Sequence, residues 1–133
     1  AVRVRKLLGT TWTSDRDTPS RPLGQADILV VAPFNAQVHL LRRVLADAGV
    51  EEVRVGTVDK FQGQEAPVVL VSMAASSPED VPRGMGFLLD RHRINVAISR
   101  AQWRAEILRS AALTAYMPRT PEGVLELGAF LRV

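Results

Sequence analysis

Several absences limit what this chain of 133 residues can be. It contains no cysteine, which excludes disulfide bonds and metal sites built from thiolates. Its two histidines, His39 and His92, lie far apart in dissimilar contexts, so no metal site is expected. No apolar run approaches the ~20 residues that a membrane-spanning helix needs, and no charged-then-apolar leader opens the chain. These absences indicate a cytoplasmic protein.

An initiator methionine is also absent, because the chain opens at Ala1 within an amphipathic segment. We therefore expect a fragment of a longer protein, with further motifs upstream. Lysine is scarce: only Lys6 and Lys60 occur among the 17 basic residues, which stand against 14 acidic ones for a formal charge of +3. Arginine suits bidentate phosphate contacts, but a GC-rich genome produces the same bias and is the simpler explanation.

What is present indicates one globular α/β domain over residues 1–133. The hydrophobic fraction is 47% and the mean hydropathy is +0.05, and both exclude a disordered chain. Continuous apolar runs bounded by turns predict buried strands. The predicted strands are 27–32, 53–55, 68–73 and 105–109. Periodicity predicts helices or helical segments over 38–48, 86–102, 111–117 and 121–131. Residues 1–9 fit a short helix or strand.

Strands that alternate with helices imply a mainly parallel sheet covered by helices on both faces. Turn-forming residues predict surface loops over 10–26 and 75–85. One helix is predicted to bury a single face, closed by Gly49, that carries Val38, Leu41, Val44, Leu45 and Ala48. In such sheets function gathers at the loops that leave the carboxyl ends of the strands. Three candidate segments are predicted at such loops or on the helices beside them.

The first segment leads from a predicted strand into a helix and starts with Pro33. The free backbone N–H groups after the proline, together with the positive end of the helix dipole, suit a phosphate. Asn35 and Gln37 add side-chain donors, and Phe34 offers a ring that can stack on a base. An ordinary turn capped by Asn35 explains the same residues. Taken alone, that turn is the better explanation.

The second segment, Thr57–Glu65, packs small and polar residues between two predicted strands. Gly63 allows close approach to the backbone. Glu65 can accept hydrogen bonds from ribose hydroxyls, whereas Thr57 and Lys60 can donate to phosphate. A surface turn with solvated carboxylates explains the segment equally well, so both interpretations stay open.

The third segment is the predicted helix that carries RHRINVAISRA. Its core face consists of Ile94, Ala97, Ile98 and Ala101. Arg93 and Arg100 are about two turns apart and project from one flank, while Asn95 and Ser99 project from the other. Two arginines on a shared edge suit a polyphosphate. In an isolated helix, arginines that are solvated or paired with acids such as Asp90 are the better explanation.

Together and in this order, VVAPFNAQ, VGTVDKFQGQE and RINVAISRAQ resemble the motifs of the second RecA-like domain in superfamily 1 helicases. The closer resemblance is to the branch that includes the RNA helicase of nonsense-mediated decay and the Okazaki-fragment nuclease-helicases. Within it, the chain is similar to bacterial proteins that carry a RecB-like nuclease module. The resemblance covers residues 27–110, and the order and spacing make it specific. It implies a RecA-like three-layer sandwich that serves an ATP-dependent DNA helicase.

The resemblance also implies a role for individual residues. Arg100 matches the arginine finger that contacts the γ-phosphate and is the candidate catalytic residue. Glu65 matches a residue that contacts the ribose, with Gly63 giving the loop its close approach. Gln62 is expected beside the phosphates. Arg93 matches the first arginine of the third motif and is a candidate structural residue.

A groove for single-stranded DNA is implied on the same ground, lined by Pro33, Asn35, Thr57 and Asp59, with RNA as the alternative ligand. Two residues depart from the pattern. Gln64 stands where the branch commonly has arginine, which removes one phosphate contact, and Ser99 replaces threonine but keeps the hydroxyl.

No Gly-x-x-x-x-Gly-Lys-(Ser/Thr) loop occurs, nor an Asp-Glu pair to hold Mg²⁺. In the helicases that the chain resembles, these belong to the first RecA-like domain. We therefore expect ATP and Mg²⁺ as cofactors of the intact protein, with Mg²⁺ held by that missing partner domain, and no activity in this chain alone. The alternative function is a non-catalytic nucleic-acid-binding or regulatory module with a helicase-like fold. A small-molecule α/β domain would need a glycine-rich turn where Pro-Phe-Asn stands.

Overall fold

The computed structural model describes residues 1–14 and 19–132. Within them, the main sheet has four parallel strands in the order β4-β3-β5-β6. The strands are β3 (Ile28–Val31), β4 (Arg54–Gly56), β5 (Ala66–Ser72) and β6 (Ala101–Leu108). The helices are α1 (Val2–Leu7), α2 (Asn35–Asp47), α3 (Gly84–Leu88), α4 (Arg91–Ile98), α5 (Ala112–Ala115) and α6 (Pro121–Phe130). Short 3₁₀ turns are η1 (Gln25–Asp27), η2 (Asp59–Phe61) and η3 (Pro78–Asp80). The four predicted strands are confirmed, with shifted ends.

The alternation of side chains along β3 divides the core into two halves. Ile28 and Val30 point into the half that α1 and α2 cover, whereas Leu29 and Val31 point into the half under α3 to α6. β5 pairs with β3 in parallel register and continues this alternation. All four β3 side chains are buried, because the strand has helices on both faces.

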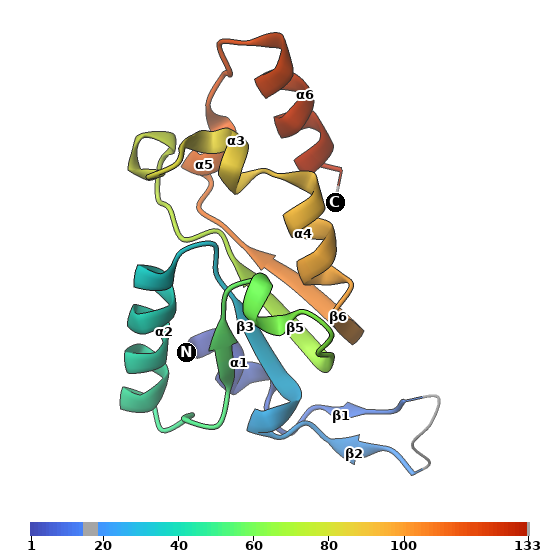
Figure 1. Cartoon of the computed structure of the whole chain (residues 1–133). Helices are drawn as coiled ribbons and strands as arrows, with labels where there is room; N and C mark the ends of the chain where they lie inside the picture. The colour runs from blue at the N-terminus through green and yellow to red at the C-terminus, as the bar shows by residue number, and fades with distance from the viewer. Residues whose placement is uncertain (15–18, 133) are drawn as a thin grey trace.

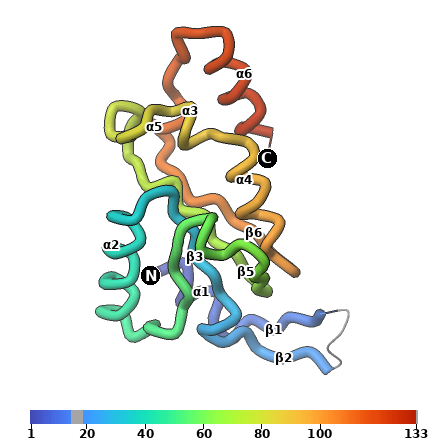
Figure 2. The backbone as a smooth tube through the Cα atoms, viewed as in Figure 1, coloured from blue at the N-terminus to red at the C-terminus, as the bar shows by residue number. Residues whose placement is uncertain are grey.

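The result is an α/β three-layer sandwich of the RecA-like type. Figure 1 shows the central sheet with α2 on one side and α4 alongside β6 on the other, while α3, α5 and α6 gather beyond the upper end of the sheet. The backbone trace in Figure 2 has the same arrangement. Among the described residues, no helix has both the length and the apolar character needed to cross a membrane.

The segment 10–26 differs from the predicted irregular loop. It contains a short antiparallel hairpin, β1 (Thr11–Trp12) with β2 (Arg21–Pro22), although the middle of the segment, 15–18, lies outside the described residues. The hairpin forms because the side chains of Trp12 and Leu23 are buried in the α1–α2 half of the core. The Arg21 guanidinium also lies 5.2 Å above the Trp12 ring. Apolar anchors therefore order a segment whose composition is typical of turns.

The predicted continuous helix 86–102 is two helices and the start of a strand. α3 ends at Leu88, and Asp90 begins α4 because its carboxylate accepts hydrogen bonds from the backbone N–H groups of His92 and Arg93, at 2.8 and 3.1 Å. The chain enters β6 at Ala101, earlier than predicted. α3 also begins within the loop predicted over 75–85, which otherwise holds η3.

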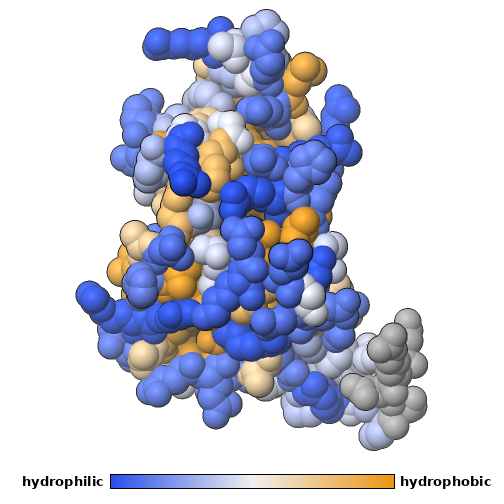
Figure 3. Space-filling view, in the orientation of Figure 1, coloured by the Kyte–Doolittle hydropathy of each residue, from blue (hydrophilic) through white to orange (hydrophobic). Residues whose placement is uncertain are grey.

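α2 buries a narrower face than its sequence predicts. Val38 and Leu45 are buried, but Val44 is 42% exposed, since it lies about 240° around the helix from Val38. Leu40 is likewise half exposed, and Figure 3 shows hydrophobic patches among the mostly hydrophilic surface near α2. Gly49 follows the helix with a φ of +70°, as predicted for its end.

An ion-pair network ties α1 to β6. The Arg3 guanidinium donates two hydrogen bonds to the Glu106 carboxylate, and the Arg104 Nε lies 2.6 Å from the same group. The hydrogen bonds from Arg3, supported by Arg104, hold the pKa of Glu106 below its usual range. The amino-terminal helix is therefore anchored by charge as well as by its buried Val4 and Leu7.

Candidate functional site

The three candidate segments lie at two opposite edges of the sheet. Pro33 and Asn35 follow the carboxyl end of β3, and Thr57 follows that of β4. Glu65 and Arg100 instead precede β5 and β6, so they lie at the amino edge. The expectation that the segments lie at loops leaving the carboxyl ends or on the helices beside them is confirmed, but the second and third segments each end at the amino edge. The long β4–β5 connection, which contains η2, runs from one edge to the other.

Arg100 is fixed between the end of α4 and the start of β6. Its Nε donates to the Val96 carbonyl at 3.1 Å, and its terminal nitrogen lies 3.4 Å from the Ser99 hydroxyl. Its own carbonyl accepts a hydrogen bond from the Ala66 N–H at 3.0 Å, which ties the start of β6 to the start of β5. These side-chain bonds use two of the five guanidinium N–H donors and leave three for an anion.

A cavity of about 300 Å³ brings Arg100 together with residues from η2 and α4. Its lining consists of Val58, Asp59, Gln62, His92, Arg93, Val96 and Arg100. Two arginines and one carboxylate line it, so the cavity carries a net positive charge. The prediction that Arg93 and Arg100 share one flank is confirmed. A cavity of this charge and size suits a phosphate group.

Glu65 lies in a second hollow of about 340 Å³ at the amino edge, lined in part by Trp12, Arg54 and Gln102. Its carboxylate accepts a hydrogen bond from the Gln102 amide at 3.2 Å, and Arg54 donates to its backbone carbonyl at 3.2 Å. Glu65 therefore does not line the cavity of Arg100, although both residues precede adjacent strands.

The same hollow contains a firm ion pair. Arg21 donates to both carboxylate oxygens of Asp27, at 2.6 and 2.7 Å, and chiefly this holds the pKa of Asp27 below its usual range. The Nε of Arg54 is buried and has no hydrogen-bond partner among the described residues. Nowhere in the described chain do three potential metal-ligating side chains gather.

At the carboxyl edge, α2 begins without a side-chain cap. Its N-cap residue is Phe34, with extended backbone, and Pro33 stands one residue before it. Asn35 is the first helical residue and is exposed, so the alternative in which Asn35 caps the helix is wrong. The first N–H groups of α2 are left to solvent or a ligand. This supports the anion-site interpretation of the segment.

The Phe34 ring is stacked on Phe87 of α3, with centroids 5.5 Å apart and planes inclined by 25°. Two guanidinium groups lie against the same Phe87 ring, that of Arg83 at 4.8 Å and that of Arg93 at 4.5 Å from its centroid. Arg93 also donates to the Asp59 carboxylate at 3.1 Å. One face of the Phe34 ring is therefore occupied within the chain, by Phe87.

Sequence reasoning missed Phe87 and His92 as site residues. Phe87 lacks a signal of its own, because an aromatic residue in a helical pattern usually belongs to the core. His92 lies between Arg91 and Arg93 in the first turn of α4, and this position between two arginines was the available signal.

Two glycines shape the β4–β5 connection. Gly63 has a φ of +77°, which favours glycine, and no atom would lie within 4 Å of an added Cβ, so the space above it is open. Gly56 is buried, and a Cβ there would lie 2.9 Å from both the Lys60 side chain and the Phe61 ring. Close packing within the chain thus involves Gly56, which the sequence did not single out.

Comparison with known proteins places this chain in a family. Residues 3–111 match the family described as AAA domain. The chain belongs to that family. It is 49% identical over 74 residues to the DNA polymerase alpha-associated DNA helicase A of Schizosaccharomyces pombe, a match that covers 56% of this chain and 11% of that protein.

Two further relatives are also named as helicases. The chain is 37% identical over 125 residues to the mouse DNA replication ATP-dependent helicase/nuclease DNA2, which covers 93% of this chain and 11% of that protein. It is 37% identical over 84 residues to the human RNA helicase Mov10l1, a match that covers 61% of this chain and 7% of that protein. This AAA domain is therefore a helicase-type domain, and it spans about a tenth of the length of these relatives.

Proposed function

We propose that this chain is the second ATPase half of a superfamily 1 DNA helicase, akin to bacterial nuclease–helicase fusions, and supplies an arginine finger through Arg100. The observation that carries the proposal is the position of Arg100 at the amino edge, in a cationic cavity. Pro33, Asn35 and Thr57 lie at the opposite edge. A motor domain needs this separation, because it contacts nucleotide on one side and nucleic acid on the other.

The amino edge suits a nucleotide in both charge and shape. Arg100 offers three guanidinium donors and Gln62 an amide within one cavity, and Glu65 offers a carboxylate for ribose hydroxyls in a separate hollow at the same edge. The open space above Gly63 allows a ligand to approach the backbone. Bound ATP supplies the free energy of phosphoryl transfer, and we assign Mg²⁺ to the first RecA-like domain of the same parent protein. Arg100 reaches across to the developing charge.

The carboxyl edge suits the backbone of single-stranded DNA. The uncapped N–H groups of α2 attract a phosphate, aided by the helix dipole, and Asn35 is exposed in that first turn. Thr57 adds a hydroxyl donor and Pro33 borders the path, whereas Asp59, also expected in the groove, lines the Arg100 cavity. We favour DNA over RNA because the relative at 49% identity is named as a DNA helicase and the relative whose match covers 93% of this chain is named for DNA replication. RNA binding is the outcome that would redirect the proposal.

Replacing the arginine finger tests the proposal in the longer protein that carries this domain. We expect Arg100→Ala to lower DNA-stimulated ATP hydrolysis by at least about 10³-fold, because the charge on the transferred phosphoryl group loses its guanidinium partner. Nucleotide binding, measured with a fluorescent ATP analogue, should persist through the first domain.

Arg91→Ala is the matched control, since Arg91 is exposed on the same helix and is not among the residues that line the Arg100 cavity. It should leave turnover within about twofold of the wild type. Turnover that survives Arg100→Ala would remove the arginine-finger assignment. A wild-type protein that binds single strands but neither binds nor hydrolyses ATP would instead be the non-catalytic module.

Salt dependence tests the groove. Binding of this chain to single-stranded DNA should be weak and should fall as salt rises, with a slope of about −0.7 per phosphate contact, since only backbone contacts are offered. Fluorescence anisotropy at several salt concentrations measures that slope. An affinity that does not change with salt contradicts a backbone groove at α2.

A further inference from the structure

Arg93 connects the three candidate segments, the second by a direct contact and the first through Phe87. It belongs to the third segment, on α4. Its guanidinium donates to the Asp59 carboxylate of the second segment at 3.1 Å. It also lies 4.5 Å from the centroid of the Phe87 ring, and Phe87 in turn stacks on Phe34 of the first segment. A line of contacts therefore runs from α4 to both parts of the carboxyl edge.

α4 connects this line to the amino edge. Arg93 is near the start of the helix, and Arg100 follows its end, held to the last turn through the Val96 carbonyl. A helix of two turns moves as a rigid body, so a displacement at Arg100 is also a displacement at Arg93. Arg93 and Arg100 line the same cavity, and Asp59 lines it too.

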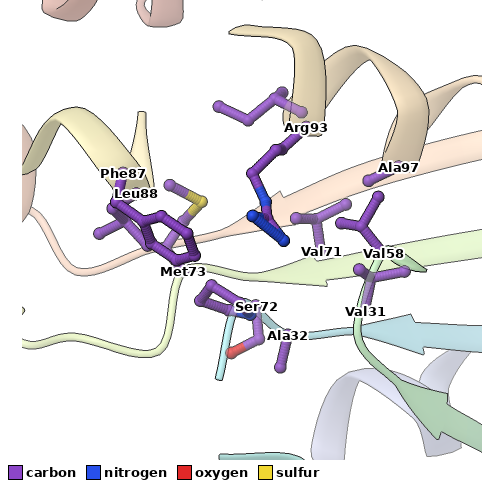
Figure 4. Close-up of a pocket in the computed structure, with 12 residues that line it drawn as sticks. Val31, Ala32, Val58, Val71, Ser72, Met73, Phe87, Leu88, Arg93 and Ala97 are labelled. Atoms are coloured by element: carbon purple, nitrogen blue, oxygen red, sulfur yellow. The ribbon is translucent and has the colours of Figure 1, made fainter. Parts of the chain in front are cut away.

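The packing beneath α4 leaves room for such a displacement. Figure 4 shows the Arg93 side chain descending toward a small apolar cavity between α4, Phe87 and the carboxyl ends of β3 and β5. The cavity has a volume of about 30 Å³, which is space for about one or two water molecules. A close-packed interior resists movement, whereas an unfilled space beside a helix allows a small shift.

The contacts of Arg93 are also weak enough to change. The side chain of Asp59 is 81% exposed, and that of Arg93 is 32% exposed. Ion pairs of this exposure contribute little to stability, because water competes for both charges. The pair can therefore open or close without loss of the fold, as a contact that reports the position of α4 must.

We propose that Arg93 is a positioning residue that couples the nucleotide edge to the nucleic-acid edge, through Asp59 on one side and the Phe87–Phe34 stack on the other. The inference rests on the proposed function. A phosphate bound at Arg100 shifts α4. The contacts of Arg93 with Asp59 and Phe87 then change. As a result, the loop at Asp59 and the start of α2 bind the single strand with a different affinity.

The test is a coupling ratio measured in the longer protein: the affinity for single-stranded DNA with a non-hydrolysable ATP analogue, divided by the affinity without nucleotide. We expect a wild-type ratio that differs from one by at least about fivefold. Arg93→Gln should bring it within about twofold of one, since it removes the charge that faces Asp59 and the cation on Phe87.

Two further variants separate the contacts. Asp59→Asn alters a strongly exposed side chain, so folding is not in question, and it should also bring the ratio toward one. Arg83→Gln is the matched control, because Arg83 lies on the same Phe87 ring, and in the described part of the chain it forms no ion pair with Asp59. It should keep the wild-type ratio.

The outcomes distinguish this inference from the proposed function. A wild-type ratio that survives Arg93→Gln and Asp59→Asn overturns the coupling role alone. Equal losses in Arg93→Gln and Arg83→Gln also overturn it, because packing on Phe87 would then explain the effect. A wild-type protein that binds neither ligand overturns the proposed function, and this inference with it.

Discussion

Gly56, at the end of β4, leaves less room for an added Cβ than any other glycine of the chain. A Cβ there would lie 2.9 Å from the Phe61 ring, and that ring is buried in the core. We expect Gly56→Ala to destabilise the chain by about 1–3 kcal/mol, since the ring must shift in a packed environment. Urea unfolding followed by circular dichroism measures the change.

Gly128 provides the matched control. It lies in α6 with no atom within 4 Å of an added Cβ. Gly128→Ala should be neutral or stabilise the chain by up to about 1 kcal/mol, because alanine favours the helix. If both substitutions have the same effect, close packing at Gly56 is not what constrains this loop.

The location of a site residue was predictable where spacing along one helix, or a matching motif, determines it. Arg93 and Arg100 share a cavity as their helical spacing predicts, and Gln62 joins them there. Glu65 was not predictable as a residue of a separate hollow, because its place depends on Arg54 of β4 and Gln102 of β6. Contacts between distant segments decide such details, and a pattern along the chain does not contain them.

At the scale of elements, α4 depends on its cap. The Asp90 carboxylate accepts hydrogen bonds from two backbone N–H groups in the first turn of the helix. We expect Asp90→Ala to cost about 1 kcal/mol of unfolding free energy, while Asp90→Asn should cost only a few tenths, since asparagine caps as well. Thermal unfolding compares them. Equal losses in both variants would mean that the charge of Asp90, and not its capping, matters.

Elements could be predicted where the sequence pattern alone determines them. β3 and β5 were predictable because helices cover both faces, and an unbroken apolar run such as DILVVA follows from that. The break between α3 and α4 was not, since periodicity continues through Asp90 and only the cap ends it. The β1–β2 hairpin escaped prediction because Trp12 is anchored by residues far along the chain.

At the scale of the whole molecule, the sheet separates two kinds of surface. Its amino edge carries Arg100 and Glu65, and its carboxyl edge carries Pro33, Asn35 and Thr57. The parallel α/β class was predictable from the alternation of elements. The edge at which Arg100 lies was not, because β6 begins at Ala101, within the stretch predicted as the helix 86–102. The division supports a motor domain that offers one wall of an ATP site.

The central claim is that this wall is only half of the site, and the isolated chain tests it most directly. ATP turnover by the chain is measured with Mg²⁺ and saturating single-stranded DNA, beside Arg100→Ala as the background. We predict no turnover above that background, because the chain's sequence has no glycine-rich phosphate loop to hold the phosphates. Turnover that Arg100→Ala abolishes would show a complete site within this chain and contradict the claim.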